Sequence, residues 1–389
     1  MTHTRGPLIA NLLAQIGFGL LAMTLCLPSM QAWAGLFDTS QSVVQLAFSL
    51  YVLPYGGFQL FFGPLSDRIG RRRVLMIGLC VGLVGALIAA TATSVAQLVL
   101  GRLVQGAGGA AGMVVGRSMV QDLFQGHERT RVMAFVGMAM GCIPPAATLL
   151  GGQIHVHWGW QWNFVLLATL GGVLLMLAWR GLPADRPRSP SHATALGFVP
   201  AYARLAQESV FLRHLVILAG TTATFYTFLS GAPLVLASYG VGPEGVGWHI
   251  ACIPMAYFCG NYLTTRLIHG WGAARVMRVG QALTLSGIVL MLLLVAAGLS
   301  SPWAVSLPLV LVGLGHGLLV PPTLSATVAV VPALAGAAAG AAGVMQQFTG
   351  AMGGYVVGLV PHDTALGMGW MMLGFASLGS IMLRRLRRS

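Results

Sequence analysis

Twelve long apolar stretches decide what this chain can fold into. Each has about the 20 residues that a helix needs to cross a lipid bilayer. They lie at residues 7–31, 43–63, 73–94, 95–119, 131–154, 161–182, 210–235, 245–267, 275–299, 303–327, 338–360 and 365–383. A backbone inside a bilayer must satisfy its own hydrogen bonds, so stretches of this length form helices. The sequence therefore predicts an all-α membrane protein with twelve transmembrane helices.

The composition fits lipid as the main solvent. Of the 389 residues, 56% are hydrophobic and 7% are charged, which is too little polar surface for a water-soluble globule of this size. The one long polar stretch lies near the middle of the chain, from Pro183 to Ser209. We therefore expect a lipid bilayer around the protein and no separate soluble domain.

The formal net charge of +13 indicates membrane topology rather than nucleic-acid binding. Short clusters between the apolar stretches hold nineteen of the twenty-one arginines, at residues 64–73, 117–131, 180–213, 266–278 and 384–388. Loops rich in arginine stay on the cytoplasmic side. The predicted outer loops contain Asp38, Glu244 and Asp363 but no arginine. We expect a multi-pass protein of the cell inner membrane with both termini in the cytoplasm.

An internal repeat supports the helix count. Residues 70–78 align with residues 272–280, at an offset of 202. The repeat predicts two pseudo-symmetric six-helix bundles, residues 1–182 and 210–389, joined by a cytoplasmic linker at 183–209. The second bundle ends in a basic cytoplasmic tail. Chance similarity between two basic loops is the alternative.

The loop after the second predicted helix combines an acid, four arginines and two glycines. Asp67 can accept hydrogen bonds from arginines or from amides at a helix N-terminus, a contact that forms when the cytoplasmic side is closed. A basic turn that merely sets topology is the alternative, but it leaves the acid and the glycines unexplained. The predicted latch comprises Gly63, Asp67, Arg68, Gly70, Arg71 and Arg72.

This loop resembles the signature of the major facilitator superfamily, Gly-x-Leu-x-Asp-Arg-x-Gly-Arg-Arg. Its surroundings resemble the bicyclomycin/chloramphenicol-resistance branch of the twelve-helix drug:proton antiporters, at Leu27-Pro28, at residues 59–67 and at residues 117–124. The second half is similar at Tyr226, Ser230, Pro233, Tyr239-Gly240 and Pro243. The resemblance implies a major facilitator fold that exports a small amphiphilic molecule, such as a drug, a metallophore or a metabolite. It also implies alternating access and protons as the coupling ion.

Two further segments resemble motifs of the same family. Arg102, Gln105 and Gly106 resemble its second motif, in which the arginine is linked to proton coupling. Burying an unpaired cation at this depth in the bilayer would cost roughly several kcal/mol of free energy, so Arg102 should face a wet cavity or a partner. A structural role, in which Arg102 bonds to backbone carbonyls, is the alternative. The fifth predicted helix resembles the antiporter motif, whose kinks let the helix flex, at Gly141, Pro144, Pro145, Gly151 and Gly152. That match is imperfect, since Thr148 replaces a usual proline and Pro145 is out of register.

All eight acidic residues lie at predicted helix ends or in loops. Proton coupling would therefore need a histidine, whose pKa suits protonation changes near neutral pH. His316 and His249 are the two possibilities, and a structural histidine is the alternative for each. A cavity without acids favours neutral or anionic cargo. Neutral polar residues in predicted spans either line a substrate cavity or bond helix to helix. They are Gln15, Thr24, Tyr51, Gln59, Tyr226, Asn261, Gln346 and Gln347.

Other functions fit the sequence less well. The same fold could serve an importer or uniporter of a small metabolite. A membrane enzyme or a non-transporting sensor is a remote alternative, because no nucleophile lies beside a plausible base and no soluble domain passes on a signal. The cysteines fall in apolar stretches and no metal-ligand spacing is present. We expect no enzyme activity, no metal, no cofactor, no nucleic-acid partner and a monomer that binds a small-molecule substrate.

Overall fold

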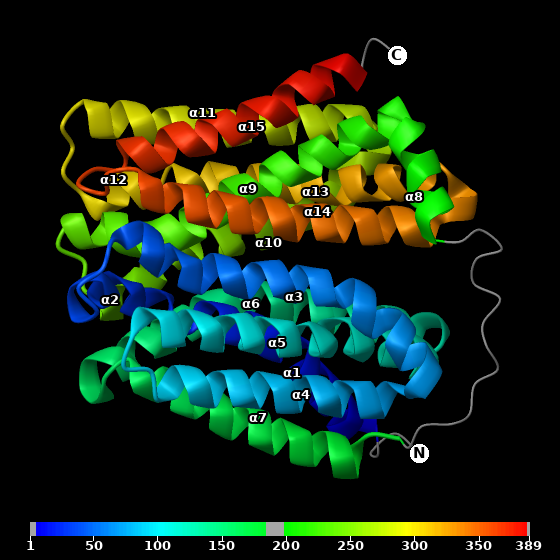
Figure 1. The fold of residues 1–389 in the computed structure, drawn as a ribbon. Helices are drawn as coiled ribbons and strands as arrows, with labels where there is room; N and C mark the ends of the chain where they lie inside the picture. The colour runs from blue at the N-terminus through cyan, green and yellow to red at the C-terminus, as the bar shows by residue number, and fades with distance from the viewer. Residues whose placement is uncertain (1–4, 184–197, 387–389) are drawn as a thin grey trace. The chain divides into compact units, whose positions relative to one another are not determined.

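The computed structural model describes residues 5–183 and 198–386, and this part of the chain is almost entirely helical (Figure 1). The α-helices are α1 (Arg5–Thr24), α2 (Met30–Leu36), α3 (Gln41–Ile69), α4 (Arg71–Ala90), α5 (Val95–Leu123), α6 (Gly126–Trp158), α7 (Gln161–Gly181), α8 (Phe198–Gln207), α9 (Ser209–Ser238), α10 (Pro243–Trp271), α11 (Ala273–Ala296), α12 (Pro302–Ser306), α13 (Leu309–Ala329), α14 (Ala335–Val356) and α15 (Leu366–Leu386). Short 3₁₀ turns lie at Leu27–Ser29, Pro332–Leu334 and Val357–Leu359. The described residues contain no β-strand, so the predicted all-α class is confirmed.

Twelve membrane-length helical segments can be counted in the described residues. Ten of them are both long enough and apolar enough to cross a membrane. The other two, α10 and α14, are as long as a span but less apolar; α14 is rich in glycine and carries Gln346 and Gln347. The predicted number of transmembrane helices is therefore confirmed.

Two of the predicted helices are interrupted, each at a proline. Proline has no amide hydrogen and its ring clashes with the preceding turn. The first span, predicted as one helix over 7–31, divides into α1 and α2 around the turn that contains Pro28. The tenth span, predicted over 303–327, divides into α12 and α13 at Pro308.

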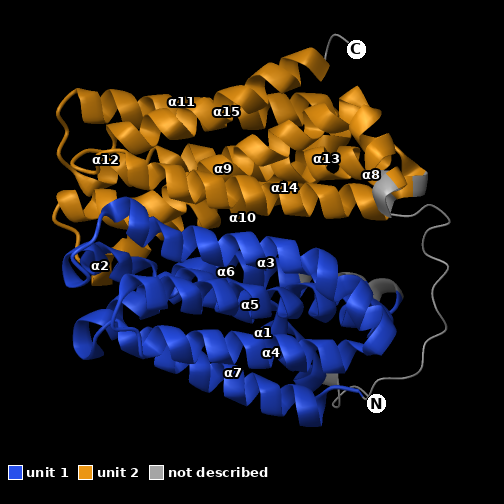
Figure 2. Ribbon diagram, in the orientation of Figure 1, with its two compact units in different colours: residues 1–192 blue, residues 193–389 orange. Residues whose placement is uncertain are grey.

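The chain forms two compact units, Met1–His192 and Ala193–Ser389 (Figure 2). Their internal packing is alike. In the first unit α5 packs against α1, α3 and α4, and in the second α13 packs in the same way against α9, α10 and α11. The repeated glycines Gly70 and Gly272 both adopt positive φ, +111° and +73°, where glycine is favoured. Each forms a one-residue break between two long helices, α3 and α4 in the first unit and α10 and α11 in the second.

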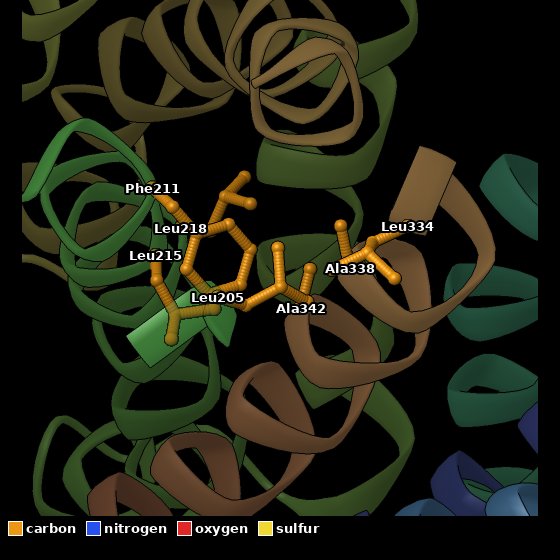
Figure 3. Packing of buried hydrophobic residues seen from close by; sticks show 7 residues of the cluster. All are labelled: Leu205, Phe211, Leu215, Leu218, Leu334, Ala338 and Ala342. Carbon is orange, nitrogen blue, oxygen red and sulfur yellow. The ribbon is translucent and has the colours of Figure 1, made fainter. Parts of the chain in front are cut away.

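Helix α8 lies within the segment expected to be a linker. Leu205 of α8 belongs to a buried hydrophobic cluster (Figure 3). The cluster also contains Phe211, Leu215 and Leu218 of α9, Leu334 of the turn before α14, and Ala338 and Ala342 of α14. Residues 198–207 are therefore part of the packing of the second unit. The rest of the expected linker, residues 184–197, and the last arginines of the tail lie outside the described residues.

Candidate functional site

Arg102 of α5 is completely buried in the first unit. Its guanidinium donates three hydrogen bonds to backbone carbonyls: Nη1 to Ala22 O at 2.8 Å, Nη2 to Met23 O at 3.3 Å and Nε to Ala47 O at 3.1 Å. Nη1 also donates to Gln105 Oε1 at 2.6 Å. The buried cation thus donates to four protein acceptors, three of which are backbone carbonyls, as the structural alternative expects.

The break after α1 explains why these carbonyls accept bonds from Arg102. The last four carbonyls of a helix have no amide partner in the same helix, and α1 ends at Thr24 because Pro28 follows. Ala22 and Met23 belong to this last turn. The negative end of the helix dipole also favours a cation there. Arg102 therefore acts as a side-chain cap on a helix that ends inside the membrane.

Tyr51 of α3 completes the surroundings of Arg102. The guanidinium carbon lies 4.0 Å from the centre of the Tyr51 ring, within the range of a cation–π contact. The Tyr51 hydroxyl donates to Gly19 O at 2.6 Å and so joins α3 to α1. A Cβ atom added to Gly106 would lie 2.2 Å from Tyr51 O, so only glycine permits this approach of α5 to α3. Arg102, Gln105, Gly106 and Tyr51 thus form one packed group.

Two predicted latch residues, Asp67 and Arg71, form an ion-pair cluster with a third residue, Asp122. Arg71 Nη2 lies 2.6 Å from Asp67 Oδ1, and Arg71 Nε lies 3.2 Å from Asp122 Oδ2. Arg71 Nη1 also donates to Ser66 Oγ at 2.5 Å. The cluster joins the ends of α3 and α5 to the start of α4. Asp122 was not among the predicted latch residues; its place in the motif-like segment 117–124 was the available signal.

The other predicted latch residues lie near this cluster but differ in their contacts. Arg72 donates to the Trp179 carbonyl and so joins α4 to α7. The Arg68 side chain is exposed to solvent. A Cβ atom at Gly63 would make an ordinary contact with Val114 at 3.5 Å, whereas the positive φ of Gly70 favours glycine strongly.

Replacing Asp122 with Asn should weaken the ion-pair cluster only modestly. The side chains of Asp67, Arg71 and Asp122 are 51%, 17% and 26% exposed, and pairs near solvent contribute about 0.2–1 kcal/mol. A double-mutant cycle of Asp122→Asn with Arg71→Gln, read by thermal unfolding, should give a coupling energy in that range that falls in high salt. The pair Asp363→Asn with Arg71→Gln is the control and should show no coupling; equal coupling in both cycles would refute the ion pair.

Pro144 and Pro145 have no amide hydrogen to donate within α6. Gly151 of the same helix packs very tightly against Leu25. Thr148 Oγ1 donates to Pro144 O at 2.8 Å, so the residue at the position where the family motif has a proline bonds to the turn that contains Pro144. A Cβ atom on Gly151 would lie 1.7 Å from Leu25 O, next to the break after α1. At Gly141 an added Cβ would meet no atom within 4 Å. Gly152 is buried beside Gly151.

The two histidines differ in their hydrogen bonding. His249 Nδ1 lies 2.8 Å from Ser306 Oγ, and its ring centre lies 4.4 Å from that of Trp303. His316 is 3% exposed, and its Nε2 has no hydrogen-bond partner among the described residues. The adjacent glycines bring α13 close to its neighbours, Gly315 to α11 and Gly317 to α10.

The neutral polar residues bond mainly within their own unit. Gln15 and Thr24 are fully buried; Gln15 Nε2 donates to Leu174 O at 2.9 Å and Thr24 Oγ1 to Leu20 O at 2.9 Å. Gln59 is half-buried and donates to Tyr55 O of its own helix at 3.0 Å.

In the second unit, the Tyr226 hydroxyl donates to Gln347 Oε1 at 3.1 Å and joins α9 to α14. Gln346 is half-buried, and Asn261 Oδ1 is buried with no hydrogen-bond partner among the described residues. The described residues hold no group of three or more histidine, cysteine or acidic side chains that could bind a metal ion.

Comparisons with known proteins place this architecture in a family. The sequence profile of the Major Facilitator Superfamily matches residues 8–354, so the chain belongs to that superfamily and is a multi-pass membrane transporter, not an enzyme. It is 27% identical to multidrug resistance protein D of Escherichia coli K12, with 94% of this chain and 92% of that protein covered. It is 30% identical to a chloramphenicol resistance protein of Pseudomonas aeruginosa, with 80% and 74% covered.

The fold also matches solved structures. An inward-facing, unoccupied bacterial homologue of the human lysosomal transporter Spinster aligns with a TM-score of 0.75 at 14% identity, with 99% of this chain and 96% of that chain covered. The predicted family and fold are confirmed.

Proposed function

We propose that this transporter exports a small amphiphilic molecule in exchange for protons, across the cell inner membrane, as a monomer with both termini in the cytoplasm. The observation that carries the proposal is the similarity to multidrug resistance protein D along nearly the whole of both chains. The arginine-rich loops and the acid-containing loops alternate between the two sides of the predicted topology, which supports the orientation.

The contacts within the first unit suggest how its residues share the work. The cluster of Asp67, Arg71 and Asp122 holds the ends of three helices together and forms part of the cytoplasmic latch. Arg102 fixes the broken first span, and α6 beside it flexes at Gly141, Pro144 and Pro145. Alternating access then uses α1 and α6 as the movable wall of the substrate path.

His316 is the better of the two histidines for carrying the coupling proton. The acidic residues in the described part of the chain lie in loops, next to helix ends or in terminal turns, so no carboxylate supports proton transfer at mid-membrane. His249 bonds to Ser306, whereas His316 Nε2 is buried with no partner among the described residues. A buried polar atom in this state is costly unless a proton, water or substrate reaches it at some stage.

Proton movement in proteoliposomes tests the proposed function. Chloramphenicol and a set of neutral, anionic and cationic amphiphiles would be added in turn to vesicles that hold the purified protein. Transported compounds should drive proton release from the vesicles, and neutral or anionic compounds should be the better substrates. His316→Asn should abolish most of the proton release per molecule transported, because asparagine cannot take up and release a proton in place of histidine. His249→Asn is the matched control and should release protons like the unchanged protein.

Two results would contradict this proposal. Labelled compound that crosses the membrane without any proton release would indicate a uniporter or another coupling ion. Release that His316→Asn leaves unchanged would remove His316 as the proton carrier.

A further inference from the structure

A basic pocket of about 620 Å³ lies on the second unit, between α11 and α15. Its lining residues are Arg278, Gln281, Ala282, Leu285, Ser380, Leu383 and Arg384. None of them belongs to the latch, the Arg102 group or the histidines described above. The two helices lie side by side in Figure 1 and pack against each other.

The lining residues share one face of each of the two helices. Positions 278, 281, 282 and 285 of α11 follow the i, i+3, i+4, i+7 pattern of a single helix face, and positions 380, 383 and 384 of α15 do the same. At the base of the pocket, buried Gln281 donates from Nε2 to Ala376 O at 2.8 Å and holds the two helices together.

The polar end of the pocket suits a phosphate group. Arg278 and Arg384 are both exposed, one from each helix, and neither α11 nor α15 contains an acidic residue. Arg278 Nε donates to Ala274 O at 3.2 Å, which uses one of the five N–H donors of its guanidinium. The Ser380 hydroxyl adds a further donor at the same wall.

The position of the pocket indicates that the phosphate is a lipid headgroup. Arg278 lies in the second turn of α11 and Arg384 in the last turn of α15, so both arginines are at the same end of an antiparallel helix pair, at the depth where arginine side chains reach headgroups. Leu285, Ala282 and Leu383 form an apolar wall for an acyl chain. Basic pockets between transmembrane helices are typical sites for anionic lipids. We propose that this pocket binds one anionic phospholipid, with its phosphodiester between Arg278 and Arg384.

Lipid binding to the purified, delipidated full-length protein tests the site. Phosphatidylglycerol and phosphatidylcholine with the same fluorescent acyl chain would be titrated in detergent and in 0.5 M salt, which screens attraction between exposed charges. The unchanged protein should prefer phosphatidylglycerol by about tenfold or more, on the scale of two arginine contacts. The double variant Arg278→Gln and Arg384→Gln should lose most of that preference.

The matched control removes the same charge from the same two helices outside the pocket. Arg275 stacks on Trp271 and Arg385 follows Arg384, and neither lines the pocket. The double variant Arg275→Gln and Arg385→Gln should keep the preference within about twofold, since pocket contacts rather than total charge carry it. If the double variant Arg278→Gln and Arg384→Gln does not fold, Ser380→Asp provides a second test. It keeps both arginines and places a negative charge beside the phosphate, so it should weaken phosphatidylglycerol binding.

Three results would overturn the proposal. Equal affinity of the unchanged protein for both lipids would show that the pocket does not select an anionic headgroup. Equal loss in the pocket variant and the control variant would indicate unspecific attraction. Displacement of phosphatidylglycerol by 10 mM glycerol 3-phosphate would mean that the site takes a free phosphate instead of a lipid.

Discussion

Arg102→Ala should destabilise the protein more than any other single loss of a charged side chain. The change removes the donor to the carbonyls of Ala22, Met23 and Ala47, and these acceptors lie where water is scarce. A buried acceptor left without a donor costs about 1–3 kcal/mol, and breaking a buried charged contact costs about 3–5 kcal/mol. We expect the midpoint of thermal unfolding in detergent to fall by roughly 10 °C, and transport to be lost with it.

A graded series separates this capping role from the charge itself. Arg102→Lys keeps the charge but cannot donate in three directions from a planar group, so it should recover only part of the stability. Gln105→Leu removes one acceptor of Arg102 and should cost about 1–2 kcal/mol. Arg131→Ala, at an exposed position of α6, is the control and should leave the unfolding midpoint almost unchanged. A midpoint for Arg102→Ala equal to that of the control would contradict the capping role.

Arg102 shows how far the sequence alone could lead. Its depth in an apolar stretch requires a partner, and this follows from the sequence and the cost of a bare cation in lipid. Which atoms serve as partners depends on where α1 ends, on its approach to α5, and on the space that Gly106 leaves for α3. These features belong to the tertiary structure. A proline at position 28 indicates that the last carbonyls of α1 lack amide partners, but it does not show which side chain will bond to them.

The same limit applies to the rest of the fold and the site. Hydropathy and charge predict the number of helices, because the bilayer sets the length of each span and the side of its basic loops. The repeat is predicted separately, from the alignment of residues 70–78 with residues 272–280. These sequence features do not predict the interruptions at Pro28 and Pro308 or the packing of α8, which depend on local backbone geometry and on contacts distant in sequence. Asp122 joins the latch residues for a similar reason: the meeting of its carboxylate with Arg71 across 51 residues depends on how α4 packs against α5.

Gly151→Ala and Gly141→Ala, two equal changes in α6, should affect stability with opposite signs. A methyl group on Gly151 would lie 1.7 Å from Leu25 O, which is backbone and cannot rotate away. The helices α1 and α6 would have to separate, at a cost of at least about 1–3 kcal/mol. On Gly141 the methyl group meets no atom within 4 Å, and alanine within a helix is favoured over glycine by about 0.5–1 kcal/mol.

Thermal unfolding and transport of the two variants should therefore diverge. Gly151→Ala should lower the unfolding midpoint by several degrees, on the order of 2–4 °C per kcal/mol, and reduce transport because the region near the α1 break is displaced. Gly141→Ala should raise the midpoint slightly but slow transport, since bending of α6 beside Pro144 and Pro145 becomes harder. An unchanged midpoint for Gly151→Ala would show that α1 and α6 do not approach this closely, and full transport by Gly141→Ala would exclude bending at that glycine from the transport cycle.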